Sequence, residues 1–193
     1  MKLSILDQSV AAQGRTQAQA LAQTVELAAW ADQQGFHRFW VSEHHSHPTI
    51  VGTAPEVLMA ALAMRTQRIR LGSAGVMLPH YSALKVAEQF RVLDALAPGR
   101  IDLGVGRAPG SDGRTAQLLN PDRYASENFP QQTIDLYTWI QRTDTEWTIH
   151  QEVAGHKIED TAGTYPLDKC PWLALRMIAI PGEDYGRGYV EEL

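Results

Sequence analysis

The stretch RIDLGVGRAPGSDGRTAQ, residues 100–117, contains the clearest indication of the fold of this chain. An apolar run over 101–105 is typical of a buried strand, and it passes directly into Gly106, Arg107 and a loop rich in Pro, Gly, Ser and Asp. Glycine lets the backbone approach a ligand closely, and a guanidinium keeps its charge at physiological pH. The stretch therefore predicts a strand that ends in an anion-binding edge, with Arg107 as the cation.

Apolar, strand-like runs alternate with helix-like segments before this point, as in parallel βαβ units. The predicted strands are 2–6, 38–42, 69–78 and 101–105, and the predicted helices are 16–35, 54–66 and 83–96. Polar and glycine-rich residues collect just after the strands, where parallel α/β folds bind their ligands. The first part of the chain is therefore predicted to be an α/β fold with a parallel sheet.

Beyond about residue 131 the pattern changes. Residues 133–140 and 147–153 are predicted to form antiparallel strands, and 172–180 a further strand. The charge changes too, since residues 1–131 hold 12 Lys and Arg against 11 Asp and Glu, whereas residues 132–193 hold 5 against 11. We therefore expect two segments, 1–131 and a β-rich 132–193.

The composition narrows the classes of function. The chain has 193 residues, of which 44% are hydrophobic and 20% charged, and a net charge of −5, which argues against general nucleic-acid binding. No apolar run reaches the ~20 residues of a membrane span, and the start MKLSILDQSV lacks a signal-peptide core. A single cysteine, Cys170, excludes an internal disulfide. We expect a cytoplasmic protein that binds neither membranes nor nucleic acid.

Four motifs of the first segment together resemble the luciferase-like, flavin-dependent monooxygenase family. They are GFHRFWVSEHH (35–45), RIRLGSAGVMLPHYSALKVAEQ (68–89), LDALAPGRIDLGVGRAPGSD (93–112) and RYASENFPQ (123–131). The resemblance implies the N-terminal part of a (β/α)8 TIM-type barrel, with about four strands present. It also implies reduced FMN as cofactor with O2 as co-substrate, a small-molecule substrate, and a flavin reductase that supplies reduced FMN.

His44 and His45 follow the second predicted strand, at the end where barrel enzymes place reactive groups. Imidazole transfers protons near neutral pH, and the resemblance implies that His44 is the catalytic residue. It implies substrate-contacting or supporting roles for His45 and Glu88. The alternatives are structural histidines, a solvent-facing Glu88, and a metal site that includes His47 and His80. The motif lacks the i, i+4 spacing of a helical zinc site, so no metal is expected.

Small residues end the third predicted strand, at Ser73-Ala74-Gly75, and leave room for a flavin ring against the main chain. The resemblance implies that Ala74 and Gly75 contact FMN and are joined by a non-prolyl cis peptide bond. It also implies that Arg107 contacts the flavin. The alternatives are that the small residues only allow helix packing and that Arg107 is a surface loop residue.

The second segment resembles a different family. Its motifs TIDLYTWI (133–140), GTYPLDKCPWLALRM (163–177) and PGEDYGRGYVEEL (181–193) resemble the head-to-tail connector, or portal, of T7-like phages, a structural ring without catalytic residues. This resemblance places a join near Gln131–Gln132. Three interpretations follow: a truncated and fused FMN-dependent monooxygenase, a phage portal fragment, or a non-functional chimera.

The length of the first segment bears on cofactor binding. A complete barrel of this type needs about 250 residues, and its phosphate site usually lies after strands 7 and 8. Four strands alone also leave two unpaired edges, which favour self-association. We therefore expect weak or no FMN binding by a single chain, and a homo-oligomer of two half barrels as a route by which binding could be restored.

Overall fold

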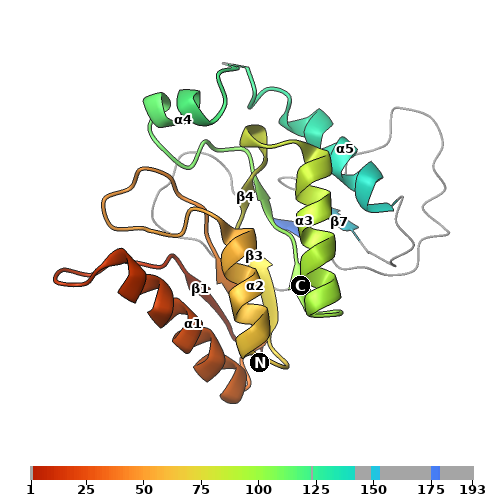
Figure 1. Cartoon of the computed structure of the whole chain (residues 1–193). Helices are drawn as coiled ribbons and strands as arrows, with labels where there is room; N and C mark the ends of the chain where they lie inside the picture. Colours follow the sequence, from red (N-terminus) through yellow and green to blue (C-terminus); the bar gives the residue numbers. More distant parts are fainter. Residues whose placement is uncertain (1, 123, 142–148, 153–174, 179–193) are drawn as a thin grey trace.

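The computed structural model describes residues 2–122, 124–141, 149–152 and 175–178. A four-stranded sheet with the order β1-β2-β3-β5 forms its centre (Figure 1). Its strands are β1 (Ser4–Asp7), β2 (Arg38–Val41), β3 (Arg70–Ser73) and β5 (Ile101–Asp102). Every neighbouring pair is parallel and follows chain order, which confirms the predicted βαβ pattern.

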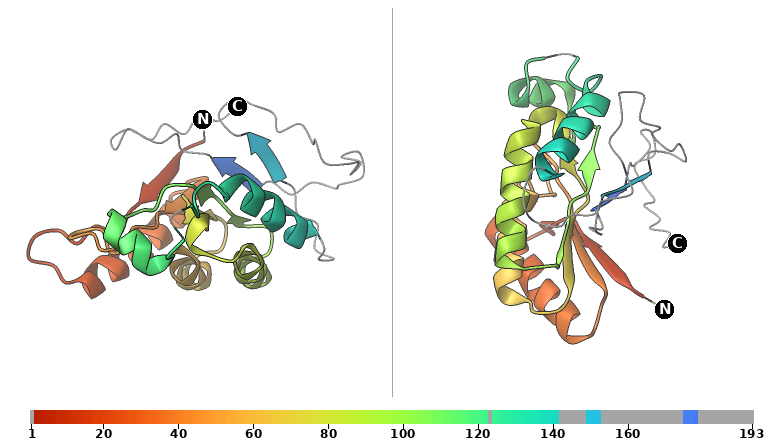
Figure 2. Two further views of the ribbon diagram at one scale, coloured as in Figure 1. Left: turned by 90° about the horizontal axis from the view of Figure 1, so that it is seen from above. Right: turned by 90° about the vertical axis from the view of Figure 1, so that its right-hand side faces the viewer.

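Three helices connect these strands and cover one face of the sheet (Figure 2, right). They are α1 (Gln17–Gln33), α2 (Pro55–Arg65) and α3 (Ala83–Leu96). Thr16 begins α1 as part of a capping box, in which its hydroxyl accepts the Gln19 N–H and the Gln19 side chain accepts the Thr16 N–H. The predicted helices are confirmed to within two residues at each end.

The hydrophobic core lies between the sheet and these helices. Phe39, Leu71 and Ile101 occupy matching positions on neighbouring strands. They belong to one buried cluster with Met59 of α2 and Phe90 of α3. Because side chains alternate along a strand, the residues between them lie on the other face of the sheet.

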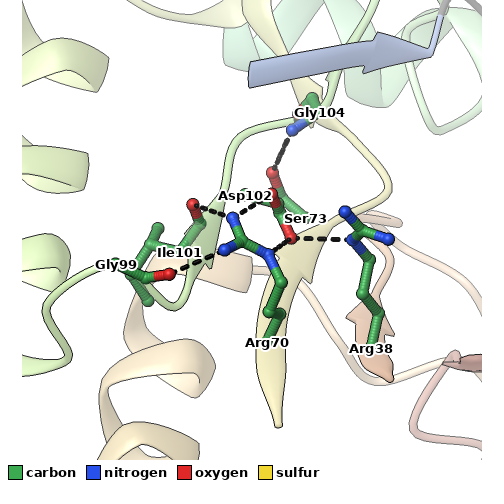
Figure 3. A network of polar contacts seen from close by, with 7 residues as sticks. All are labelled: Arg38, Arg70, Ser73, Gly99, Ile101, Asp102 and Gly104. Atoms are coloured by element: carbon green, nitrogen blue, oxygen red, sulfur yellow. Dashed lines mark hydrogen bonds and ion pairs between the residues drawn. The ribbon is translucent and has the colours of Figure 1, made fainter. Parts of the chain in front are cut away.

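That other face carries a buried ion-pair network (Figure 3). Arg38 and Arg70 lie opposite each other in the β2–β3 register. The Asp102 carboxylate lies 3.1 Å from Arg38 Nε and 2.6 Å from Arg70 Nη2, and its side chain is 1% exposed. A buried charge needs such partners in place of water, so this network fixes the positions of β2, β3 and β5 relative to one another.

The third and fourth predicted strands are each interrupted after their first half. The segment predicted at 69–78 consists of β3, β4 (Val76–Met77) and the short 3-10 helix η1 (Leu78–His80). The segment predicted at 101–105 consists of β5 and the start of β6 (Val105–Gly106), and β4 and β6 pair in a sheet of their own.

A side chain joins the two strands at this interruption. The Ser73 hydroxyl donates to the Gly104 carbonyl at 2.8 Å and accepts the Gly104 N–H at 3.0 Å. A Cβ atom on Gly104 would lie 2.2 Å from the Ser73 carbonyl oxygen. Only glycine fits at position 104, this close to the Ser73 backbone. Beyond this point the chain leaves the main sheet, and β4 and β6 pair with each other.

Residues 133–140, predicted to be a strand, lie instead in helix α5 (Phe129–Gln141). The buried residues of this helix, spaced as on one helical face, are Phe129, Thr133, Leu136 and Ile140. The helix packs against α3 (Figure 1). The strand prediction is wrong because this helical spacing decides the structure, and the expected join at Gln131–Gln132 lies inside the helix.

Another helix, α4 (Gly113–Leu119), begins within the last residues of the stretch 100–117 and was not predicted. Two further strands, β7 (Ile149–Glu152) and β8 (Leu175–Ile178), lie within the predicted strands 147–153 and 172–180. They pair in parallel with each other. The antiparallel pairing predicted between 133–140 and 147–153 is wrong, because 133–140 lies in helix α5. The remaining portal-like motif residues lie outside the described residues. No helix in the described part of the chain is long and apolar enough to cross a membrane.

Candidate functional site

Three loops meet at the carboxyl ends of the strands, and we call residues 43–45, 77–81 and 106–110 the rim. The His45 N–H donates to the Gly110 carbonyl at 2.9 Å. The His80 Nε2 lies 2.8 Å from the Pro109 carbonyl oxygen. These bonds join segments that are far apart in the sequence, at the edge where parallel α/β folds bind ligands.

A buried glutamate connects two of the three rim segments. Glu43 is fully buried, and its Oε2 accepts the Met77 N–H at 2.8 Å. Its Oε1 accepts the Tyr81 hydroxyl at 2.5 Å and lies 2.7 Å from His45 Nε2. Burial, and then the hydrogen bond to Glu43, raise the pKa of Tyr81, so its phenol stays protonated and donates.

His44 has a different environment from His45. Its N–H donates to the Gly52 carbonyl at 2.9 Å, and its ring meets that of His47 edge-on with centroids 6.3 Å apart. Burial lowers the pKa of His44, and the imidazoles of His47 and His45 lower it further. Its Nδ1 is buried without a hydrogen-bond partner among the described residues. A neutral imidazole in this setting is suited to accept a proton.

Ala74 and Gly75 lie between the ends of neighbouring strands, close to the rim. The Ala74 N–H donates to the Val41 carbonyl at 2.7 Å. A Cβ on Gly75 would lie 2.9 Å from the Val105 carbonyl carbon, so backbone meets backbone there. The peptide bond between Ala74 and Gly75 is cis, as the resemblance implied. Their contact with a flavin stays a prediction.

Arg107 and His80 line the same cleft, which has a volume of about 360 Å³. The Arg107 Nε donates to the Ser126 carbonyl at 3.0 Å, which holds the exposed guanidinium beside the cleft. The His45 ring meets the His80 ring edge-on, with centroids 5.9 Å apart. The structure thus brings Arg107 to the same rim as His44, His45 and His80, and the role of Arg107 in flavin binding stays a prediction.

Glu88 is the candidate that the structure does not bring to the rim. Its side chain is 54% exposed on α3, and its carboxylate lies 3.5 Å from Lys85 Nζ. This is the solvent-facing position that the sequence left open as an alternative. In the part of the chain that the structure describes, no cluster of three or more His, Cys, Asp or Glu side chains is arranged to hold a metal ion.

A larger hollow of about 580 Å³ lies at the opposite ends of the strands, and its lining includes Arg70 and Arg100. These guanidinium groups already bind the backbone: Arg70 donates to the Gly99 carbonyl, and Arg100 donates to the Ile69 carbonyl. The cations there therefore stabilise the loops that lead into the strands, and we assign this hollow no catalytic part.

Glu43 and Tyr81 were not assigned from the sequence. One signal was available, because a carboxylate directly before two histidines at a strand end can pair with one of them. No comparable signal existed for Tyr81. Its hydroxyl reaches Glu43 only because η1 turns the chain back toward the end of β2.

The rim can now be compared with known proteins. A family model described as Luciferase-like monooxygenase matches residues 1–166. This chain belongs to the luciferase-like monooxygenase family. The match includes all three rim segments and extends well beyond Gln131.

Curated members of the luciferase-like family support the assignment. The chain is 54% identical over 138 residues to N-acetyl-S-alkylcysteine monooxygenase of Bacillus subtilis, with 69% of this chain and 41% of that protein covered. It is 44% identical over 144 residues to a luciferase-like monooxygenase of Escherichia coli K12, with 73% and 42% covered. The chain thus spans about two fifths of the length of these relatives.

Solved structures show the same fold. The crystal structure of apo-MsnO8 is 43% identical with a TM-score of 0.68, over 72% of this chain and 42% of that one. The oxygenating constituent of 3,6-diketocamphane monooxygenase from Pseudomonas putida, solved in complex with FMN, is 22% identical with a TM-score of 0.63 over 74% of this chain and 39% of that one. The second likeness concerns the fold alone.

The luciferase-like match also bears on the portal interpretation. It crosses the expected join near Gln131–Gln132, as does helix α5. The matched proteins give no support to a phage portal segment or to a chimera. The division into segments 1–131 and 132–193 stays a prediction.

Proposed function

We propose that this chain carries the flavin-contacting rim of an FMN-dependent monooxygenase. The observation that supports it most is the meeting of the Glu43–His45 loop, the Ala74–Gly75 peptide and the Arg107 loop at the carboxyl ends of parallel strands. When bound, reduced FMN would supply the electrons with which one atom of O2 enters a small organic substrate and the other leaves as water.

The rim residues fit such a ligand. The small residues Ala74 and Gly75 bring main chain without bulky side chains to the strand ends, where a flat ring can lie close to backbone. His44 carries a buried Nδ1 that no described residue satisfies, so a bound ligand or substrate can supply its partner. Arg107 offers a fixed cation to an anionic or polar edge.

Each residue then has a role that its surroundings permit. His44, held neutral by burial and by its neighbours, would take a proton from the substrate or return one to it. Arg107 would orient the cofactor by charge-assisted hydrogen bonds. A flavin reductase would provide reduced FMN, and the printed name of the Bacillus subtilis relative makes N-acetyl-S-alkylcysteines the first substrates to assay.

The test is an FMN titration to about 1 mM, followed by flavin fluorescence, on the wild-type protein and on Arg107→Ala. We expect Arg107→Ala to weaken FMN binding by about tenfold to a hundredfold, because one charge-assisted hydrogen bond contributes about 1.5–3 kcal/mol. Glu88→Gln serves as control, since this exposed residue pairs only with Lys85 among the described contacts, and it should leave the affinity unchanged.

Two results would contradict the proposal. One is that the fluorescence of FMN is the same with and without the wild-type protein at every FMN concentration of the titration. The other is equal affinity in the wild type and Arg107→Ala. With a reductase and NADH present, oxygen uptake that increases on addition of an N-acetyl-S-alkylcysteine would further support the monooxygenase assignment.

A further inference from the structure

We propose that Glu43 is the positioning residue of the rim and that its carboxylate sets the orientation and the tautomer of His45. The structural part of this proposal stands on the contacts of Glu43 alone. Only the importance of this tautomer for a bound cofactor or substrate rests on the proposed function. Glu43 itself reaches none of the candidate flavin contacts directly, so its effect passes through its three partners.

The three partners of Glu43 require an acceptor at both of its oxygens. The Met77 backbone N–H can only donate, and it lies 2.8 Å from Oε2. The Tyr81 hydroxyl donates to Oε1, and His45 Nε2 lies 2.7 Å from the same oxygen. A carboxylate is a pure acceptor, so the His45 nitrogen that faces it carries the proton. Neutral His45 then has its basic lone pair on Nδ1.

The contact between Glu43 Oε1 and His45 Nε2 fixes the position of the His45 ring. Its main-chain N–H donates to Gly110 in the loop after β6, and its ring edge meets His80 at the start of the cleft. Through Met77, the same carboxylate holds β4, whose first residue directly follows Gly75. One fully buried group therefore sets the relative positions of two rim segments, and the His45 main chain joins the third.

The alternative is that Glu43 has only a structural role. Glu43 would then hold Met77 and Tyr81 in place, and the proton on His45 would be decided by solvent or by His80. The two roles differ in one observable, the ring nitrogen of His45 that carries the proton. That nitrogen can be identified by 15N NMR of the imidazole rings at alkaline pH, where histidines are neutral.

Glu43→Gln is the decisive variant, because a glutamine has one acceptor oxygen and one donor NH2 in nearly the same shape. The Met77 N–H cannot become an acceptor, so the amide oxygen should face it. The NH2 group then faces His45 Nε2, which must accept. We expect neutral His45 to be protonated on Nε2 in the wild type and to switch to Nδ1 in Glu43→Gln.

Tyr81→Phe and Glu88→Gln are the matched controls. Tyr81→Phe removes another partner of the same carboxylate but keeps the acceptor for Nε2, so the His45 tautomer should not change. Glu88→Gln changes an exposed glutamate outside the rim and should also leave it unchanged. A folded Glu43→Gln protein with the wild-type His45 tautomer would overturn the proposal.

The wild-type spectrum tests the proposal even if Glu43→Gln does not fold. If neutral His45 carries its proton on Nδ1 in the wild-type protein, the proposal is wrong. Failure of this proposal is also distinct from failure of the proposed function. Wild-type protein without FMN binding would overturn the function, whereas the tautomer result would still support or exclude the role of Glu43.

Discussion

His44 and His45 are neighbours in the chain, yet their surroundings give them different chemistry. The buried Glu43 carboxylate holds His45 by its Nε2. His44 has no carboxylate partner among the described hydrogen bonds, and burial lowers its pKa. The sequence predicted that both rings lie at a strand end, but it did not distinguish them. The difference comes from which way each side chain points after β2.

The depressed pKa of His44 predicts a dependence of stability on pH. Its folded-state pKa lies below the ordinary value of 6.5, so the unfolded chain binds the proton first as the pH falls. The stability contributed by neutral His44 is therefore present above that value and is lost as the pH falls through the folded-state pKa. Urea denaturation between about pH 7 and pH 5 should show a shallower decline for His44→Gln than for the wild type.

The substitution His47→Gln provides the comparison for this experiment. It removes one neighbouring imidazole but keeps His44, so the decline should stay closer to that of the wild type. If His44→Gln and the wild type lose stability in parallel as the pH falls, the assigned pKa shift is wrong.

Among the secondary-structure elements, α5 is the clearest difference between prediction and structure. The run TIDLYTWI contains β-branched and aromatic residues, which favour a strand by local propensity. Packing against α3 outweighs that propensity, because Leu136 and Ile140 lie one turn apart on the face that α3 covers. The helices α1 to α3 were predictable from their helical spacing, supported by the Thr16 capping box in α1 and by Pro55 at the start of α2.

A pair of substitutions in α5 tests the helix directly. Leu136 is buried and Ile134 is 44% exposed. On a strand, residues two apart share one face, whereas on a helix they lie on nearly opposite faces. We expect Leu136→Ala to lower the free energy of unfolding by about 2–5 kcal/mol and Ile134→Ala by about 0.5 kcal/mol or less. Chemical denaturation measures both, and equal effects would favour the strand.

At the scale of the whole molecule, the described residues supply four parallel strands in the main sheet, a part of the barrel seen in longer relatives. The rim lies at the carboxyl ends of these strands. The loops that usually hold a phosphate in such barrels follow the seventh and eighth strands, and this chain covers about two fifths of its curated relatives.

This arrangement predicts that the chain binds FMN more weakly than a full-length relative does. Side-by-side titrations of these 193 residues and of the oxygenating constituent of 3,6-diketocamphane monooxygenase, which was solved with FMN, should show a dissociation constant at least about a hundredfold larger for this chain, as expected if phosphate contacts worth roughly 3 kcal/mol are not made. Protein that purifies with nearly stoichiometric flavin would contradict this. Sedimentation at each FMN concentration would show whether any strong binding belongs to an oligomer.

Local sequence patterns predicted the order of the main-sheet strands and of helices α1 to α3, and the positions of the candidate residues after the strands. Those features follow from local periodicity, capping and turn residues, which are all short-range. The tertiary structure alone decided that 133–140 is a helix, that Glu88 faces solvent, and that Glu43 and Tyr81 belong to the rim. The places of Glu43 and Tyr81 in the rim depend on contacts between residues more than thirty positions apart, Glu43 with Met77 and with Tyr81, which no local pattern encodes.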